Sequence, residues 1–268
     1  MAEVTLLYHA KTIGYICERI ARESKGKIEA LCDRQVLPKK IKGTVIRWDS
    51  RESVEADQTL NTAEAVLLSR NKRESRIRMG KLCPPTWTHF DDLEYPCLIR
   101  PRRHYAAHKF FVCHTGKEAK RSIAMCGLRR YYASPIIDKK LEYRVFGLQD
   151  HILKVVRRFH DDPKQVAWNI ANGGRSVRLK HDSWPIEVVK RALLAGRALG
   201  LDWFAADVIV DNQDRPFVLE LNTAPGLQRE ATIENLVEVF TWAVEHKPPP
   251  LNDLKGDSWD DYIHPALL

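Results

Sequence analysis

The chain has 268 residues, of which 44% are hydrophobic and 29% charged, a balance that excludes a disordered protein. Its apolar runs are far shorter than the roughly 20 residues that a membrane-spanning helix needs, so we expect no membrane partner. Lys and Arg number 43 against 35 Asp and Glu, and the formal net charge of +8 favours anionic partners such as nucleotides, acidic peptides or nucleic acid.

Cysteine usage and the first residues indicate the compartment. Six cysteines occur, none of them two or three positions apart as in a zinc knuckle, and a chain of this length needs no disulfide to stabilise its core. The first residues lack the basic start and apolar stretch of a secretory signal. We therefore expect a cytoplasmic protein with reduced and mostly buried thiols at Cys17, Cys32, Cys83, Cys97, Cys113 and Cys126.

The first region, residues 1–62, alternates between strand and helix patterns. Val4–Tyr8 is a short apolar run, and Ile13–Arg22 carries apolar residues at helical spacing. Lys27–Cys32 and Thr44–Trp48 follow as strands. This alternation predicts a small α/β domain with a parallel sheet, and the absence of a G-x-G-x-x-G motif leaves a dinucleotide site there unsupported.

The second region, residues 63–132, is basic and mixed in structure. Asn61–Gly80 has a helical pattern rich in Arg and Lys, and the prolines that follow stop it. Pro96–Arg103 is predicted to be a buried strand ending in cations, FFVCH a second strand, and Lys117–Cys126 a helix. We interpret this region as a small α+β lid.

The third region, residues 133–246, has the most regular pattern. LEYRVFGL and HILKVVRRF alternate as an antiparallel hairpin, and Ile186–Leu199 is a clear amphipathic helix that Gly200 terminates. The strands FAADVIVD and PFVLELN follow, and then a last helix over Ile233–Glu245. A Pro-rich linker and acidic tail occupy residues 247–268, so the region before them is predicted to be an antiparallel-sheet domain.

An Asp on one of these strands and a Glu-x-Asn on the next are the chemically informative residues. Glu220 and Asn222 are two positions apart and share one face of a strand, and Asp207 joins them if the two strands form a hairpin. Two carboxylates and a carboxamide are hard oxygen ligands that suit Mg²⁺ on nucleotide phosphates. The alternative is a solvated polar sheet face, which the surrounding apolar residues disfavour.

The segment ALLAGRALGLDWFAADVIVDNQDRPFVLELNTAPGL resembles the C-terminal signature of the ATP-grasp superfamily. There a Gly-Leu-Asp precedes the first metal carboxylate, and L-E-x-N-x-x-P-G supplies the other two ligands. The resemblance extends from about residue 61 to residue 241 and is closest to the RimK-like glutamate-ligase branch, with a looser similarity to compact bacteriophage members. It implies the ATP-grasp fold, ATP as cofactor, and two Mg²⁺ ions held by Asp207, Glu220 and Asn222.

The same resemblance assigns residues that hold the nucleotide. Lys72 stands where a lysine on the helix entering the lid contacts phosphate, and Arg100 replaces a second lysine at the end of a lid strand. Glu142 is the implied partner of the ribose hydroxyls. A hinge segment that reads adenine through its backbone is implied at Ser134, Pro135, Ile136 and Ile137.

Substrate residues follow less directly. Arg144 shares a strand face with Glu142, and only one of Arg157 and Arg158 can point into the cleft; we favour Arg158. Asn169 is retained from a stretch that helps hold the acyl phosphate in the glutamate ligases, although Ala167 stands where their arginine would be.

Two further segments carry open alternatives. The lid loop has no Gly or Ser, and His104 and His108 either replace its usual donors or are ordinary surface residues. In RWDSR, Arg47, Asp49 and Arg51 either hold a substrate carboxylate or form a charged strand exit.

The implied activity is ATP-dependent ligation of a carboxylate to an amine through an acyl phosphate. The substrate would be an amino acid, a peptide or a protein tail. Two alternatives stay open, namely a kinase of the same fold that phosphorylates a hydroxyl and a non-catalytic nucleotide-binding or nucleic-acid-binding protein.

Overall fold

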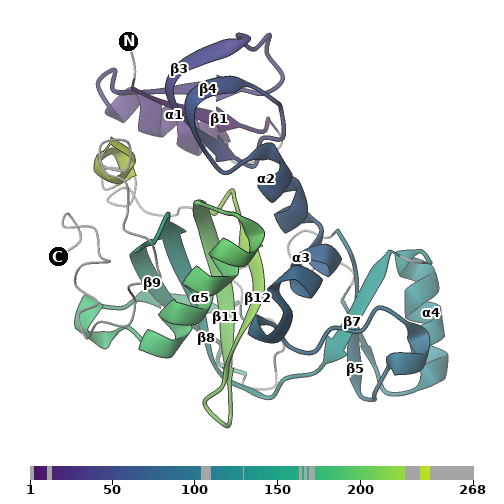
Figure 1. Ribbon diagram of the computed structural model, residues 1–268. Coiled ribbons are helices and arrows are strands. Elements are labelled where there is room, and N and C mark those ends of the chain that lie inside the picture. The colour runs from purple at the N-terminus through teal and green to yellow at the C-terminus, as the bar shows by residue number, and fades with distance from the viewer. Residues whose placement is uncertain are drawn as a thin grey trace.

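The computed structural model describes residues 3–10, 14–103, 110–128, 130–162, 165, 168, 173–226 and 236–241. The described elements form three separate sheets, one of four strands, one of five and one of three (Figure 1). The predictions for Asn169, Ala167, His104 and His108 lie outside the described residues, as does the tail over 247–268. The mixed α/β and α+β fold class is confirmed, whereas the four domain boundaries stay predictions.

The first sheet is parallel, in the order β2-β1-β3-β4, as the alternation of strand and helix predicted. Its central strand β1 is buried along its whole length, which its unbroken apolar run explains. The last strand was missed at the sequence level, because its residues EADQTL have little apolar character. The elements are β1 (Val4–Tyr8), α1 (Gly14–Glu23), β2 (Ile28–Cys32), β3 (Lys40–Trp48) and β4 (Glu55–Leu60).

The five-stranded sheet is antiparallel throughout, in the order β10-β9-β8-β11-β12. The expected hairpin forms its centre and turns at Gln149, which has a positive φ of 54°. The elements are β8 (Lys139–Leu148), β9 (His151–Phe159), β10 (Arg175–Arg178), α5 (Ile186–Leu199), β11 (Trp203–Asp211) and β12 (Pro216–Asn222). A single turn of 3₁₀ helix, η4 (His181–Ser183), precedes α5.

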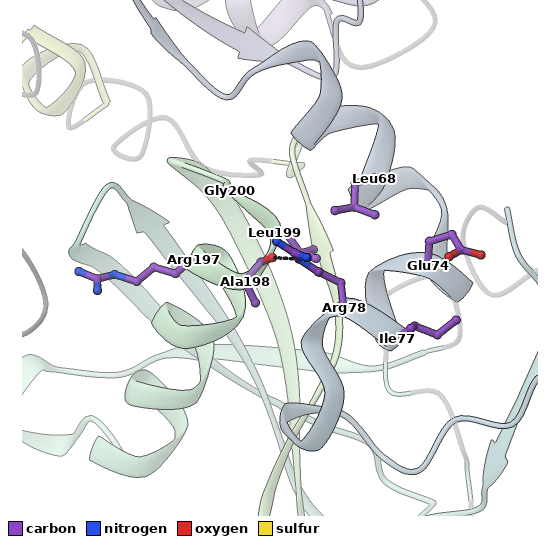
Figure 2. Close-up of a pocket in the computed structure, with 8 residues that line it drawn as sticks. All are labelled: Leu68, Glu74, Ile77, Arg78, Arg197, Ala198, Leu199 and Gly200. Atoms are coloured by element: carbon purple, nitrogen blue, oxygen red, sulfur yellow. Dashed lines mark hydrogen bonds between the residues drawn. The ribbon is translucent and has the colours of Figure 1, made fainter.

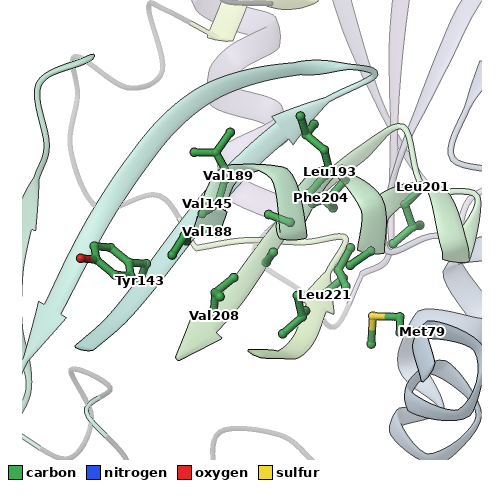
Figure 3. Packing of buried hydrophobic residues seen from close by; sticks show 14 of the residues in the cluster. Met79, Tyr143, Val145, Val188, Val189, Leu193, Leu201, Phe204, Val208 and Leu221 are labelled. Atoms are coloured by element: carbon green, nitrogen blue, oxygen red, sulfur yellow. The ribbon is translucent and has the colours of Figure 1, made fainter. Parts of the chain in front are cut away.

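Helix α5 covers one face of this sheet and buries its apolar stripe there (Figures 1 and 3). Gly147 and Gly196 permit the close approach, because a Cβ on either would come within 2.5 Å or 2.4 Å of the Phe204 ring. The helix ends as predicted at Gly200, whose φ of 66° and ψ of 34° are left-handed. The opposite face of the sheet is therefore left for other contacts.

The three-stranded sheet, in the antiparallel order β6-β5-β7, lies apart from the other two and packs against α4 (Figure 1). Thr115 caps α4 by accepting a hydrogen bond from the backbone N–H of Glu118 at 3.3 Å. Its elements, with a preceding 3₁₀ turn, are η2 (Phe90–Asp92), β5 (Cys97–Pro101), β6 (Phe111–Cys113), α4 (Gly116–Cys126) and β7 (Tyr131–Pro135).

The expected single helix over Asn61–Gly80 is two helices, α2 (Ala63–Arg70) and α3 (Lys72–Met79), followed by η1 (Gly80–Leu82). Asn71 separates them, because its ψ of 87° is not helical and its Oδ1 accepts a hydrogen bond from the N–H of Glu74 at 3.4 Å. Asparagine side chains compete with the helical hydrogen-bond pattern in this way. The break places Lys72 at the first position of the second helix.

One core joins the parallel sheet to the five-stranded sheet, and Trp48 and Trp203 meet there with ring centroids 5.1 Å apart. Residues 236–241 are helical and contribute Phe240 to the same core. Asn61, directly after β4, is fully buried and hydrogen-bonds to the backbone of the two residues at the start of β11. Its Nδ2 donates to the carbonyl of Trp203 at 2.7 Å, and its Oδ1 accepts from the N–H groups of Asp202 and Trp203 at 2.8 and 2.9 Å.

The cysteines are free thiols, and four of the six are buried, as expected. Burial raises the pKa of both Cys83 and Cys97 to about 11. None of the helices in the described part of the chain is both long enough and apolar enough to cross a membrane.

Candidate active site

The face of the five-stranded sheet that α5 leaves uncovered carries charged residues. Asp207 lies directly opposite Glu220 in the pairing of β11 with β12, and Ala205 lies opposite Asn222. Asp207 also lies opposite Arg144 on its other side. The hairpin expected from the sequence therefore brings the two carboxylates and the carboxamide to one face. We call this set the polar face, and it comprises Glu142, Arg144, Arg158, Asp207, Glu220 and Asn222.

A β-bulge makes this arrangement possible. Val218 and Leu221 both pack in the cluster beneath α5, although residues three apart on a regular strand point to opposite faces. The pairing shifts by one residue between Asp207 and Val208, so that Leu219 is the additional residue on β12. Because the bulge restores the alternation beyond it, Glu220 and Asn222 turn away from α5 and toward Asp207.

Arginines from β8 and β9 hold the carboxylates of the polar face. Arg144 donates from Nε and Nη2 to the two carboxylate oxygens of Asp207, both at 2.7 Å. Arg158 Nη1 lies 3.1 Å from Glu142 Oε1 and 3.3 Å from Asp207 Oδ1. Arg157 is exposed, so of the two neighbouring arginines Arg158 is the one on the polar face, and its catalytic role stays a prediction.

The ion pairs alter the proton affinities of these groups. Burial by itself raises the pKa of Asp207, but Arg144 and Arg158 outweigh it and hold that pKa below its usual range. For Arg144 the effect of burial alone has the opposite sign and lowers the pKa. The negative charge of Asp207 outweighs it, so the pKa of Arg144 is raised. Lys139 donates to Glu142 Oε2 at 2.6 Å, yet its burial lowers its pKa. Asp207 is therefore held as a carboxylate at neutral pH.

Lys72 reaches the polar face from the start of α3. Its Nζ donates to the carbonyl of Leu221 at 3.2 Å and lies 3.6 Å from Glu220 Oε2. Its backbone N–H donates to the carbonyl of Arg102 at 2.7 Å, just beyond the end of β5. Lys72 therefore connects the end of the three-stranded sheet to the carboxylates, at the position expected for a phosphate-binding lysine.

Of the other predicted nucleotide residues, Arg100 and the hinge lie on or beside the three-stranded sheet, whereas Glu142 lies on the five-stranded sheet. Arg100 on β5 pairs with Tyr132 of β7, and its guanidinium lies over the Phe110 ring at 5.6 Å. The expected hinge, which comprises Ser134, Pro135, Ile136 and Ile137, spans the end of β7 and the connection to β8. Ser134 is buried and the other three residues are half-buried. Glu142 lies near the start of β8, between Lys139 and Arg158.

The donor set suits a hard divalent cation. Asp207, Glu220 and Asn222 present carboxylate and carboxamide oxygens on one face, and Asn222 Nδ2 donates to Glu220 Oε1 at 3.1 Å. Within the described residues there is no cluster of three His, Cys, Asp or Glu side chains spaced to hold a metal, and Asn222 as a third metal ligand stays a prediction. The bidentate pairing of Asp207 with Arg144 means that a metal there competes with, or shares the carboxylate with, a guanidinium.

The carboxyl end of the parallel sheet contacts the end of β12, and sequence reasoning missed most of this edge. Asp49 accepts a hydrogen bond from Thr223 Oγ1 at 3.4 Å and pairs with Arg70. His9 and Asp33, which follow β1 and β2, form a hydrogen-bonded pair at 2.8 Å. His9 and Asp33 each directly follow a predicted strand, and the carboxyl ends of parallel strands meet at one edge of a sheet. This position after the strands is the sequence signal that could have predicted their proximity.

Arg47 is placed differently from the carboxylate-binding role considered for RWDSR. It is 3% exposed and donates to the carbonyls of Asn61 and Glu52 at 3.2 and 3.1 Å. Arg47 therefore organises the loop after β3.

A cavity of about 470 Å³ lies elsewhere, between α2, α3 and the end of α5 (Figure 2). Arg78 crosses it and donates to the carbonyl of Ala198 at 3.2 Å. None of the residues of the polar face lines it, so it is separate from the site. Its lining comprises Leu68, Glu74, Ile77, Arg78, Arg197, Ala198, Leu199 and Gly200.

Comparison with solved structures identifies the fold of this chain, whereas comparison of the sequence finds no match. No family model and no curated protein matches the sequence. Among solved structures, the ATP-grasp ligase PsnB with its minimal precursor, Mg and ADP matches with a TM-score of 0.65 at 9% identity, over 91% of this chain and 99% of that one. This chain has the ATP-grasp fold. D-alanine–D-alanine ligase from Bacillus anthracis matches with a TM-score of 0.62 at 13% identity, over 91% and 98% of the two chains.

Biotin carboxylase from Campylobacter jejuni also matches, with a TM-score of 0.56 at 12% identity, over 93% of this chain and 72% of that one. The expected ATP-grasp fold is thus confirmed. At such low identities the likeness establishes the fold, and the roles of individual residues and the RimK-like and bacteriophage similarities stay predictions.

Proposed function

We propose that this protein is an ATP-dependent carboxylate-amine ligase that forms an amide bond through an acyl-phosphate intermediate. One observation carries the proposal, namely the convergence of Asp207, Glu220, Asn222 and Lys72 on one sheet face. Solved ATP-grasp ligases that share the fold, one of them described with Mg and ADP, support it further. The proposal includes a RimK-like amino-acid ligase working in the cytoplasm.

The residues of this chain divide the work between nucleotide and substrate. Asp207, Glu220 and Asn222 would hold two Mg²⁺ ions, which neutralise phosphate charge during phosphoryl transfer. Lys72 and Arg100 would bind the phosphates, and the connection from β7 to β8 would hold the adenine.

The substrate carboxylate would be activated beside the arginines of the polar face. Its oxygen attacks the γ-phosphorus of ATP and forms the acyl phosphate, while ADP leaves. Arg158 and Arg144 lie beside Asp207 and would orient the transferred group by bidentate hydrogen bonds. Glu142 would take the ribose hydroxyls. The basic chain favours an acidic acceptor such as an amino acid, a peptide or a protein tail, and Asn169 is proposed to assist there.

Substrate pools provide the test. The protein is incubated with Mg²⁺-ATP and pools of amino acids and acidic peptides, and ADP release is measured together with product masses. We expect a product whose mass equals acid plus amine minus water. Glu220→Gln should reduce its formation by at least about 100-fold, because a ligand to the phosphoryl-transfer metals is lost.

Glu187→Gln is the matched control, because Glu187 lies on the exposed side of α5 with its side chain 73% accessible. It should retain wild-type activity. A phosphorylated hydroxyl product would identify a kinase instead, and ATP binding with no turnover on any pool would contradict the ligase.

A further inference from the structure

Helix α3 lies between the five-stranded and the three-stranded sheet, beside β12 and β7 (Figure 1). β12 is the last strand of its sheet, so its outer side has no neighbouring strand to supply hydrogen-bond donors. Two side chains of α3 supply them instead. Lys72 Nζ donates to the carbonyl of Leu221 at 3.2 Å, and Arg76 Nε donates to the carbonyl of Leu219 at 3.1 Å. The helix is therefore attached to the strand that carries two of the predicted metal ligands.

Arg76 also contacts the three-stranded sheet. Its guanidinium carbon lies over the Tyr132 ring, 5.0 Å from the centroid, where the face of the ring attracts a cation. Tyr132 is buried on β7, directly opposite Arg100 of β5 in the strand pairing. Lys72 makes a second connection to this sheet, because its N–H donates to the carbonyl of Arg102. A single turn of α3 is thus attached to both sheets, with Lys72 at one end and Arg76 at the other.

The burial of Arg76 is a further indication of its role. The residue is 3% exposed, and its Nη1 is buried without a hydrogen-bond partner among the described residues. A buried charged group with an unpaired donor costs stability, and an apolar side chain would fill the same space without this cost. Stability alone therefore does not account for a guanidinium here. Its contacts with the two sheets do, because a planar guanidinium can donate at its edge while its face covers a ring.

We propose that Arg76 is a positioning residue that fixes Lys72 for contact with the nucleotide phosphates; this inference rests on the proposed ATP-dependent function. Lys72 is the first residue of α3 and lies four positions before Arg76, on the same face of the helix. Its Nζ is 3.6 Å from Glu220 Oε2, so a shift of α3 would move the ammonium away from the carboxylates that would hold the metal. Arg76 prevents this shift by fastening the helix to both sheets. Without the guanidinium, Lys72 is present but misplaced, and Mg²⁺-ATP binds more weakly.

A double-mutant cycle separates positioning from general damage to the fold. Titration calorimetry measures the dissociation constant of Mg²⁺-ATP for wild type, Arg76→Met, Lys72→Met and the double variant. Arg76→Met and Lys72→Met should each raise this constant about tenfold, which millimolar ATP still measures. In the Lys72→Met background, Arg76→Met should change it by less than about twofold, because the group that Arg76 positions is already absent.

Arg76→Lys is the conservative variant. Its ammonium can reach the carbonyl of Leu219 or the ring of Tyr132 but cannot serve both as the guanidinium does, so we expect a loss of about threefold. This loss should also disappear in the Lys72→Met background. Far-UV circular dichroism checks that each variant is folded, and if Arg76→Met is not, Arg76→Lys takes its place in the cycle.

Arg78→Met is the matched control, because Arg78 is an exposed arginine of the same helix that donates to Ala198 at the end of α5, and it should bind Mg²⁺-ATP as wild type does. Unchanged binding in both Arg76 variants would overturn the inference. An equal loss in both Lys72 backgrounds would also overturn it, because Arg76 would then act on the fold and not through Lys72. If wild type itself binds no Mg²⁺-ATP, the proposed function fails and the inference fails with it.

Discussion

Replacement of Asn61 tests how the parallel sheet is fastened to the sheet that carries the polar face. This fully buried side chain makes three short hydrogen bonds to the backbone of Asp202 and Trp203, at the start of the strand that bears Asp207. It also has a φ of 65°, which asparagine tolerates better than alanine. Both the side chain and the backbone conformation therefore contribute to stability.

The magnitude follows from these contacts. Three buried hydrogen bonds at about 1 kcal/mol each predict a loss of about 3 kcal/mol for Asn61→Gly, which keeps the backbone conformation. Asn61→Ala adds roughly 1 kcal/mol of left-handed strain and should cost about 4 kcal/mol in the free energy of unfolding. Asn212→Ala, at an exposed turn where the side chain donates to Asp138, should stay within about 0.5 kcal/mol of wild type.

Urea unfolding followed by far-UV circular dichroism provides the assay, with tryptophan fluorescence as a second probe of the same transition. A loss below about 1 kcal/mol in both Asn61 variants would refute the reasoning, because buried partners would then have found other hydrogen bonds. Greater stability of Asn61→Ala than of Asn61→Gly would refute the argument from the backbone conformation.

Two further predictions concern Asp207. Arg144→Gln should bind Mn²⁺ roughly tenfold more tightly than wild type in the absence of nucleotide, measured by titration calorimetry, because a guanidinium no longer competes for the carboxylate; weaker binding would contradict this competition. The second prediction concerns the free energy of unfolding, which should be larger for wild type than for Asp207→Asn. This difference should be constant from neutral pH down to about pH 5 and should disappear as the pH falls below about 4. The folded-state pKa of Asp207 is lowered, so its ion pairs stabilise the fold above the ordinary carboxyl pKa and are lost as pH falls through the folded value. Urea midpoints across this range measure the difference, and one that widens at acid pH would reverse the sign of the argument.

The elements of the fold could be predicted where their pattern is local. β1 and the helix α5 match their expected ranges, because apolar periodicity and a terminating glycine act within a few residues. β4 was missed because its polar residues EADQTL form a strand only through pairing with β3. The break at Asn71 was also missed, because basic residues continue the helical pattern on both sides of it.

The sequence alone determined that Glu220 and Asn222 share a face and that Asp207 can join them, because strand alternation and a short turn are local properties. Tertiary structure decided which cations meet these carboxylates. Arg144 is 63 residues from Asp207 in the chain, and nothing in the local pattern specifies that pairing. The pairing of His9 with Asp33 likewise needs adjacent parallel strands. Such contacts depend on which strands become neighbours, and the burial of apolar faces over the whole chain decides that choice.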